Sequence, residues 1–120
     1  MNWIVLETTR IASWLAGFTT KFRDRCVALH FNILEGTVTV TLLPEMEHIE
    51  ETLERKELIR FGGVRSIDTP TRDTQTLGDL ISISCRIEQD THMCEVLLRD
   101  IDGTELHVDF LFLNCKAAAE

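Results

Sequence analysis

An α+β domain built on a curved antiparallel sheet is the fold class that this 120-residue chain predicts. The first observation is the period-two alternation of apolar side chains over Arg25–Leu43 and, three times, over residues 79–113. The second is the helical spacing of apolar residues near the N-terminus and over Pro44–Lys56. We therefore expect about six strands, in one strongly curved sheet or in two layers, with an N-terminal helix and one inserted acidic helix. Residues 1–115 are expected to form a single domain, and residues 116–120 a low-complexity tail.

The N-terminal segment has the apolar stripe of a helix over residues 3–18. The stripe consists of Ile4, Ile11, Leu15 and Phe18. Asn2 is the expected cap of its first turn, because an asparagine oxygen can accept a hydrogen bond from a free backbone amide there. The apolar run from Trp3 to Leu6 could equally be a short strand, and the sequence leaves both alternatives open.

A β-hairpin is predicted over Arg25–Leu43, with its turn at Glu35-Gly36. The facing apolar pairs in this register are Ile33 with Val38, Phe31 with Val40, and Leu29 with Leu42. The opposite face carries threonines and other polar side chains, so it is expected to face water. On that face His30 is a surface residue rather than a ligand.

Helical spacing returns over Pro44–Lys56, where a proline suits the first turn and glutamates occupy the outer face. Residues 57–67 then have strand character. The pair Gly62-Gly63 in the middle of that strand indicates a β-bulge or a close approach of two backbones. If this strand lay exposed at a sheet edge, two copies of the chain could pair through it as a homodimer.

The register of the final meander follows from its two turns, Gln89-Asp90 and Ile101-Asp102-Gly103. Gly103 supplies the left-handed residue that the second turn needs. The predicted pairs are Cys85–Cys94, Ile83–Val96, Ile81–Leu98, Leu98–Leu106, Val96–Val108 and Cys94–Phe110. A slip of one residue would turn every apolar row to the opposite face, so the apolar pattern specifies this register.

Composition excludes several classes of function. The net charge of −8 is concentrated in residues 45–57, which carry −4, and in residues 88–120, which carry −6, so nucleic acid is not an expected partner. No apolar run approaches the roughly 18 residues that cross a membrane, and no basic leader precedes the first one. The four cysteines lack metal-ligand spacing, so we expect a cytoplasmic protein without a cofactor. A disulfide between Cys85 and Cys94 is the alternative to free thiols.

Acidic side chains are the candidate binding residues, and a basic protein is the partner that they predict. They are Glu47, Glu50, Glu51 and Glu54 on the inserted helix, with Asp102 and Glu105 on the meander. Solubility is the plainer explanation of the same charges. No nucleophile or phosphate-loop motif accompanies them, so the chain is not expected to be an enzyme.

The alternative to a protein partner is a small ligand or a divalent metal ion. The register of the meander places Glu95 directly opposite Asp109, with His107 two residues along the same strand. Two carboxylates and an imidazole can bind a divalent cation, and we expect such a site on the meander, between the sheet and a helix. Arg86, which lies diagonal to Glu95, could instead form a salt bridge, so both alternatives remain open.

Three segments of the chain, in order after the first hairpin, carry a family resemblance. They are Leu58-Ile59-Arg60-Phe61-Gly62-Gly63-Val64, Asp79-Leu80-Ile81-Ser82-Ile83 and Gly103-Thr104-Glu105-Leu106-His107-Val108. Over residues 24–114 this order is similar to small bacterial immunity-like proteins found beside polymorphic toxins. The N-terminal helix and the inserted acidic helix depart from that pattern. The resemblance implies a non-enzymatic protein that occludes a toxin, with no catalytic residues to carry over.

Overall fold

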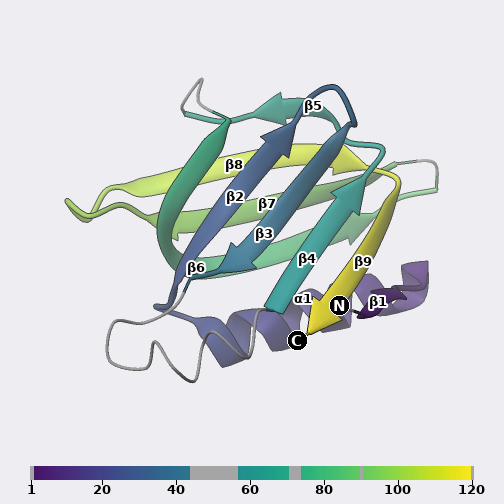
Figure 1. Cartoon of the computed structure of the whole chain (residues 1–120), viewed down its shortest axis with the longest axis horizontal. Helices are drawn as coiled ribbons and strands as arrows, with labels where there is room; N and C mark the ends of the chain where they lie inside the picture. Colours follow the sequence, from purple (N-terminus) through teal and green to yellow (C-terminus); the bar gives the residue numbers. More distant parts are fainter. Residues whose placement is uncertain (1, 44–56, 71–73, 90, 120) are drawn as a thin grey trace.

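The computed structural model describes residues 2–43, 57–70, 74–89 and 91–119, which contain one helix, α1 (Thr8–Phe22), and nine strands. The strands are β1 (Asn2–Val5), β2 (Cys26–Asn32), β3 (Thr37–Leu42), β4 (Glu57–Gly62), β5 (Arg65–Asp68), β6 (Gln75–Ile87), β7 (His92–Arg99), β8 (Glu105–Phe112) and β9 (Asn114–Ala119). They form one antiparallel sheet in the order β1-β9-β4-β3-β2-β6-β7-β8-β5. The sheet is strongly curved, and α1 lies across one end of it (Figure 1).

The predicted α+β class with a curved antiparallel sheet is confirmed, but the number of strands was underestimated. The sheet has nine strands because β1, β5 and β9 come from segments that the apolar pattern did not resolve as separate strands. The acidic helix predicted over Pro44–Lys56 lies outside the described residues. Within the described ranges, the helix is too short and too polar to cross a membrane.

The N-terminal segment is a strand followed by a helix, so the strand alternative for Trp3–Leu6 is the one observed and a single helix from residue 3 is wrong. Asn2 therefore lies in β1 and caps no helix. The residue at the helix cap is Glu7, whose backbone is extended and whose side chain makes no capping hydrogen bond. The apolar run pairs with β9 instead, where its backbone amides and carbonyls are satisfied by a neighbouring strand.

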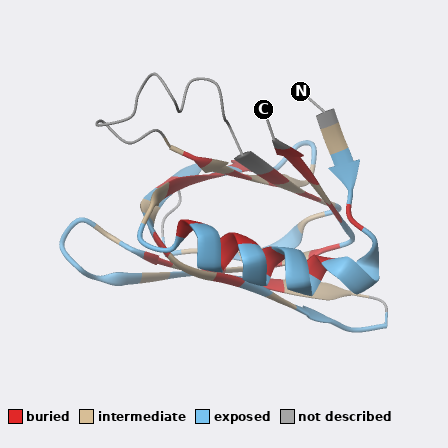
Figure 2. Cartoon of the chain, turned by 90° about the horizontal axis from the view of Figure 1, so that it is seen from below, coloured by how far each residue is buried: buried red, intermediate tan, exposed pale blue. Residues whose placement is uncertain are grey.

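Helix α1 covers part of the inner face of the sheet with its apolar side and exposes the other side (Figure 2). The buried side consists of Ile11, Leu15, Phe18, Thr19 and Phe22. The Thr19 hydroxyl donates a hydrogen bond to the Ile83 carbonyl and accepts one from the Ile83 amide, both at 3.0 Å. This buried pair of hydrogen bonds fixes the helix on β6.

One hydrophobic core lies between the helix and the curved sheet. Phe61 of β4 has its ring centroid 5.0 Å from that of Phe110 and 4.9 Å from that of Phe112, in edge-to-face geometry. Strands that are distant in the sheet order therefore meet through their inward side chains, since β4 and β8 contribute to the same aromatic cluster.

The first hairpin has the predicted faces but a different register. Val27 lies opposite Leu42, Leu29 opposite Val40, and Phe31 opposite Val38, a shift of two residues from the prediction. An even shift keeps each side chain on its face, so the apolar rows survive it. The shift leaves Ile33 fully outside the ladder, in a turn that runs to Gly36, and His30 is exposed as expected.

The Gly62-Gly63 pair forms a corner between two strands and is not a bulge within one. β4 ends at Gly62 next to β9 and β3, and β5 begins at Arg65 next to β8 at the edge of the sheet. Gly63 has φ +62°, and the Leu113 amide donates a 2.9 Å hydrogen bond to the Gly62 carbonyl. Because β4 is an inner strand, Gly62 does not lie at an edge of the sheet; the edge strands of the described sheet are β1 and β5, and a homodimer joined through a sheet edge stays a prediction.

The predicted C-terminal tail is also wrong, because residues 114–119 form β9 between β1 and β4. Ala117 and Ala118 are 3% and 4% exposed, and Cys115 is 1% exposed. A run of alanines has no apolar alternation to mark a strand, but small side chains can fill positions where the sheet meets the helix. The domain therefore extends beyond residue 115.

The final meander matches its predicted register almost completely. The pairs Cys85–Cys94, Ile83–Val96, Leu98–Leu106, Val96–Val108 and Cys94–Phe110 are confirmed. The exception is the expected partner of Leu98 on β6, which is Leu80 rather than Ile81, since the register shifts between Leu80 and Ser82. Gly103 has φ +88°, the left-handed conformation that its turn predicts.

Candidate functional site

The outward face of the meander brings together carboxylates from three strands. Glu95 lies opposite Asp109, and His107 lies opposite Leu97, both as the sequence predicts. The structure adds Asp68 of β5, which lies opposite Asp109 on its other side. Sequence reasoning missed Asp68 because nothing in the Gly62-Gly63 segment showed that the chain crosses to the far edge of the sheet.

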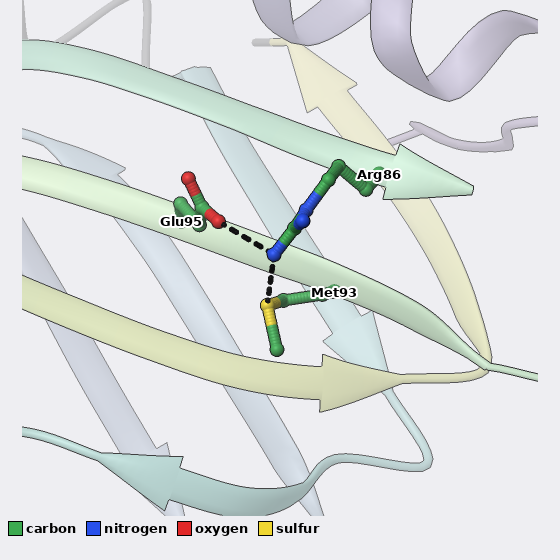
Figure 3. Close-up of polar contacts among 3 residues, drawn as sticks. All are labelled: Arg86, Met93 and Glu95. Carbon is green, nitrogen blue, oxygen red and sulfur yellow. Dashed lines mark hydrogen bonds and ion pairs between the residues drawn. The ribbon is translucent and has the colours of Figure 1, made fainter. Parts of the chain in front are cut away.

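We call Asp68, Asp109 and Glu95, which lie side by side on three adjacent strands, the row. Arg86 is the cation closest to the row among the described contacts. Its Nη2 lies 3.2 Å from Glu95 Oε1 and 3.3 Å from Met93 Sδ. Figure 3 shows how the three side chains lie and marks both contacts. The contact is the predicted diagonal salt bridge, and both side chains are largely in water, so it contributes little to stability. It engages Glu95 and leaves the row with more carboxylates than cations.

Within the row, Asp109 is the residue whose pKa is raised by its surroundings. Partial burial raises the pKa of its carboxyl, and the neighbouring carboxylates of Glu95 and Asp68 raise it further. His107 and Arg86 oppose that shift without cancelling it. Like charges placed directly opposite each other across strands destabilise a sheet, so this row is held at some cost to folding.

Two further acidic residues lie at the turn end of the same hairpin. Asp102 Oδ1 accepts a 2.9 Å hydrogen bond from the Thr104 amide, and this bond lowers the pKa of the Asp102 carboxyl. Glu105 lies opposite Arg99 and on the same face as Asp109, because residues two apart in a strand share a face. We call Asp68, Glu95, Asp102, Glu105 and Asp109 the acidic face.

The remaining predicted partner-binding residues cannot be placed with these. Glu47, Glu50, Glu51 and Glu54 lie outside the described residues. The acidic face therefore rests on the meander and β5 alone. Over residues 91–113 the chain has five carboxylates and one arginine, which keeps this surface strongly negative without the inserted segment.

The geometry gives no support to a metal site. Glu95, His107 and Asp109 point outward, whereas their strand neighbours Val96 and Val108 are buried in the core, so they do not lie between the sheet and the helix as expected. In the part of the chain that the structure describes, no three histidine, cysteine or acidic side chains are grouped so as to hold a metal ion.

The cysteines show no activated thiol. All four are free, and Cys85 faces Cys94 across the strands as predicted. Burial raises the pKa of the Cys94 thiol well above its usual value and that of Cys115 to about 12. Burial also raises the pKa of Cys26 and Cys85, so each thiol stays protonated and weakly nucleophilic at neutral pH.

The comparisons with known proteins add no relative to this geometry. A scan against protein-family models gave no match, and searches of the curated proteins and of the solved structures gave no significant match. Function must therefore be inferred from the surfaces of this chain.

Proposed function

We propose that this protein is a non-enzymatic binding protein whose acidic face binds a basic protein partner and neutralises it. The observation that carries the proposal is the row of Asp68, Asp109 and Glu95 across three adjacent strands. Like charges placed directly opposite each other across strands reduce the stability of the sheet. The stability of the fold therefore does not explain why three carboxylates lie together here. A lysine- or arginine-rich surface placed against the row would relieve that repulsion.

The surrounding sheet suits such a role. The acidic face lies mostly on regular strands that the aromatic core supports from the other side, so the backbone that carries its carboxylates is held in place before a partner arrives. Preorganised charge of one sign speeds association with a partner of the opposite sign and opposes binding of acidic proteins. The net charge of −8 acts in the same direction at longer range.

This mode of action agrees with the resemblance to immunity-like proteins of polymorphic toxin systems. In that setting the basic partner is a toxin domain, and the protein works in the cytoplasm by covering the partner's functional surface. The face requires no cofactor and no catalytic group, since occlusion needs only affinity and shape.

The test is affinity capture from native lysate with three forms of the tagged protein as bait. The first is the unchanged chain, and the second is the D68N/E95Q/D109N variant, which removes the charge of the row and keeps its shape. The third is a matched control, E7Q/E35Q/E88Q, which removes three exposed carboxylates elsewhere and reduces the net negative charge by the same amount.

The proposal predicts a stoichiometric basic partner on the unchanged and control baits that washes off at high salt. The row variant is expected to retain far less of it. Equal retention by all three baits would contradict a role for the acidic face. Equal loss from both variants would mean that net charge alone attracts the partner.

A further inference from the structure

A cleft lies between helix α1 and the strands β1, β4 and β9, on the inner side of the sheet. Figure 1 shows where these four elements lie. The volume of the cleft is about 550 Å³, within the range of small-molecule sites. It is lined by Ile4, Arg10, Ser13, Trp14, Gly17, Phe18, Lys21, Phe22, Ile59, Ala117 and Ala118. None of these residues belongs to the acidic face.

Small residues open this space where the helix faces the sheet. A Cβ built on Gly17 would meet no atom within 4 Å, although glycine is an unfavourable residue inside a helix. Across the cleft, Ala117, which pairs with Ile4 and Ile59 of the lining, presents only a methyl group. Two large apolar side chains are left in water at its margin, since Ile4 is 59% and Trp14 is 44% exposed. The lining thus offers apolar surface that nothing described in the chain covers.

The charge of the lining is opposite to that of the protein. Arg10 and Lys21 are its only ionisable residues, and no acidic residue lines the cleft among those described. Arg10, Trp14, Gly17 and Lys21 follow one another at spacings of four, three and four residues, so they form one stripe along α1. At 1.5 Å per residue, the Cα atoms of Arg10 and Lys21 lie roughly 16 Å apart along the helix axis.

We infer that this cleft binds an amphipathic carboxylate, a molecule with an unbranched apolar body and one carboxylate head. Arg10 is the anchor for the head, because a guanidinium can hold a carboxylate through two parallel hydrogen bonds. The apolar body lies along Trp14 and over the open position at Gly17, toward Phe18. The inference does not depend on the proposed function, since the cleft and the acidic face lie on opposite sides of the sheet.

Tryptophan fluorescence gives a direct test, because the chain has two tryptophans and only Trp14 lines the cleft. Trp3 instead has the Arg60 guanidinium 4.7 Å and the Lys116 ammonium 4.9 Å from its ring centre. In a W3F background, sodium decanoate is titrated below its micelle concentration, with decanol as the uncharged probe. Calorimetry of the unsubstituted protein repeats the titration in case W3F perturbs β1.

We expect saturable decanoate binding with decanol at least tenfold weaker, because a charge-assisted contact is lost. R10Q should weaken decanoate about tenfold and leave decanol unchanged, whereas R65Q, a matched surface control, should change neither. No saturable signal with decanoate, or equal affinity for the two probes together with an unaffected R10Q variant, would overturn the inference.

Filling the cleft gives an independent check with a well-folded variant. G17L places a leucine in the open position of the helix and replaces glycine by a better helix former, so its melting temperature should rise. Decanoate binding should be lost in G17L. Retained binding would overturn the site, as would a dimer in sedimentation that G17L dissociates, because a second copy would then occupy the cleft.

Discussion

Replacing Gly63 by alanine should destabilise the protein far more than the same change at Gly103. Both glycines have positive φ, +62° and +88°, so each alanine incurs a backbone cost of about 1–2 kcal/mol. The sites differ in their surroundings: a Cβ at Gly63 would lie 2.7 Å from Leu113 Cδ1 and 2.8 Å from Leu113 Cβ, whereas one at Gly103 meets nothing within 4 Å. Overpacking adds about 1–3 kcal/mol at Gly63 alone.

Urea denaturation monitored by circular dichroism measures the difference. We expect G63A to lose about 3 kcal/mol and G103A about 1 kcal/mol, because the lower entropy of the unfolded chain offsets the loss equally in both and the clash is present only in G63A. L113A in the G63A background should recover part of the loss, because it removes the contacts with Leu113 Cγ and Cδ1 and leaves only the one with Cβ. Equal losses in G63A and G103A would refute the tight corner at which β4 passes to β5 beside β9.

The other predictions concern charge, thiols and the C-terminus. D109N should stabilise the protein by about 0.5 kcal/mol at pH 7, a small gain because water screens this face. Because the pKa of Asp109 is raised, folding favours its protonated form, so the gain from D109N should vanish as the pH falls below 3.8. A gain that stays the same at every pH in urea titrations would contradict charge repulsion as its cause. In native protein at pH 7.5, the buried thiols Cys94 and Cys115 should react with a thiol reagent only on unfolding, and prompt reaction of all four thiols would show that the core is open. A chain that ends at Cys115 should lose cooperative unfolding, because it lacks most of β9; a sharp, unchanged transition would show that residues 116–119 are the dispensable tail that composition indicated.

The meander could be predicted in detail because two kinds of local information agree there. Strict apolar alternation specifies the faces, and the short turns on either side of β7 specify the register. This is why the opposition of Glu95 and Asp109 and the diagonal contact of Arg86 were both expected from the sequence alone.

The features that were predicted wrongly depend on contacts between residues distant in sequence. Gly62-Gly63 carries the same local signal for a bulge and for a corner, and only the pairing of β5 with β8 distinguishes them. That pairing also brings Asp68 into the acidic face. Likewise the alanines of β9 have no periodicity, and their place in the sheet is decided by partners in β1 and β4.

The cleft beneath α1 escaped prediction for a related reason. A glycine within a helix indicates a weak point of that helix. Its place in a cleft becomes apparent only when β9 is known to place the small side chain of Ala117 across from it. The helix expected over residues 3–18 ends before Lys21, whereas α1 runs from Thr8 to Phe22 and places Lys21 on one stripe with Arg10.

The most direct test of the proposed function is the affinity of the captured partner for the D68N/E95Q/D109N variant, measured beside E7Q/E35Q/E88Q at physiological salt. If each carboxylate of the row contributes about 1 kcal/mol, the upper end for exposed ion pairs, the dissociation constant should rise roughly a hundredfold in the row variant. The control variant should stay close to the unchanged protein. Equal affinities for the row variant and the control would contradict the claim that this face is the binding surface.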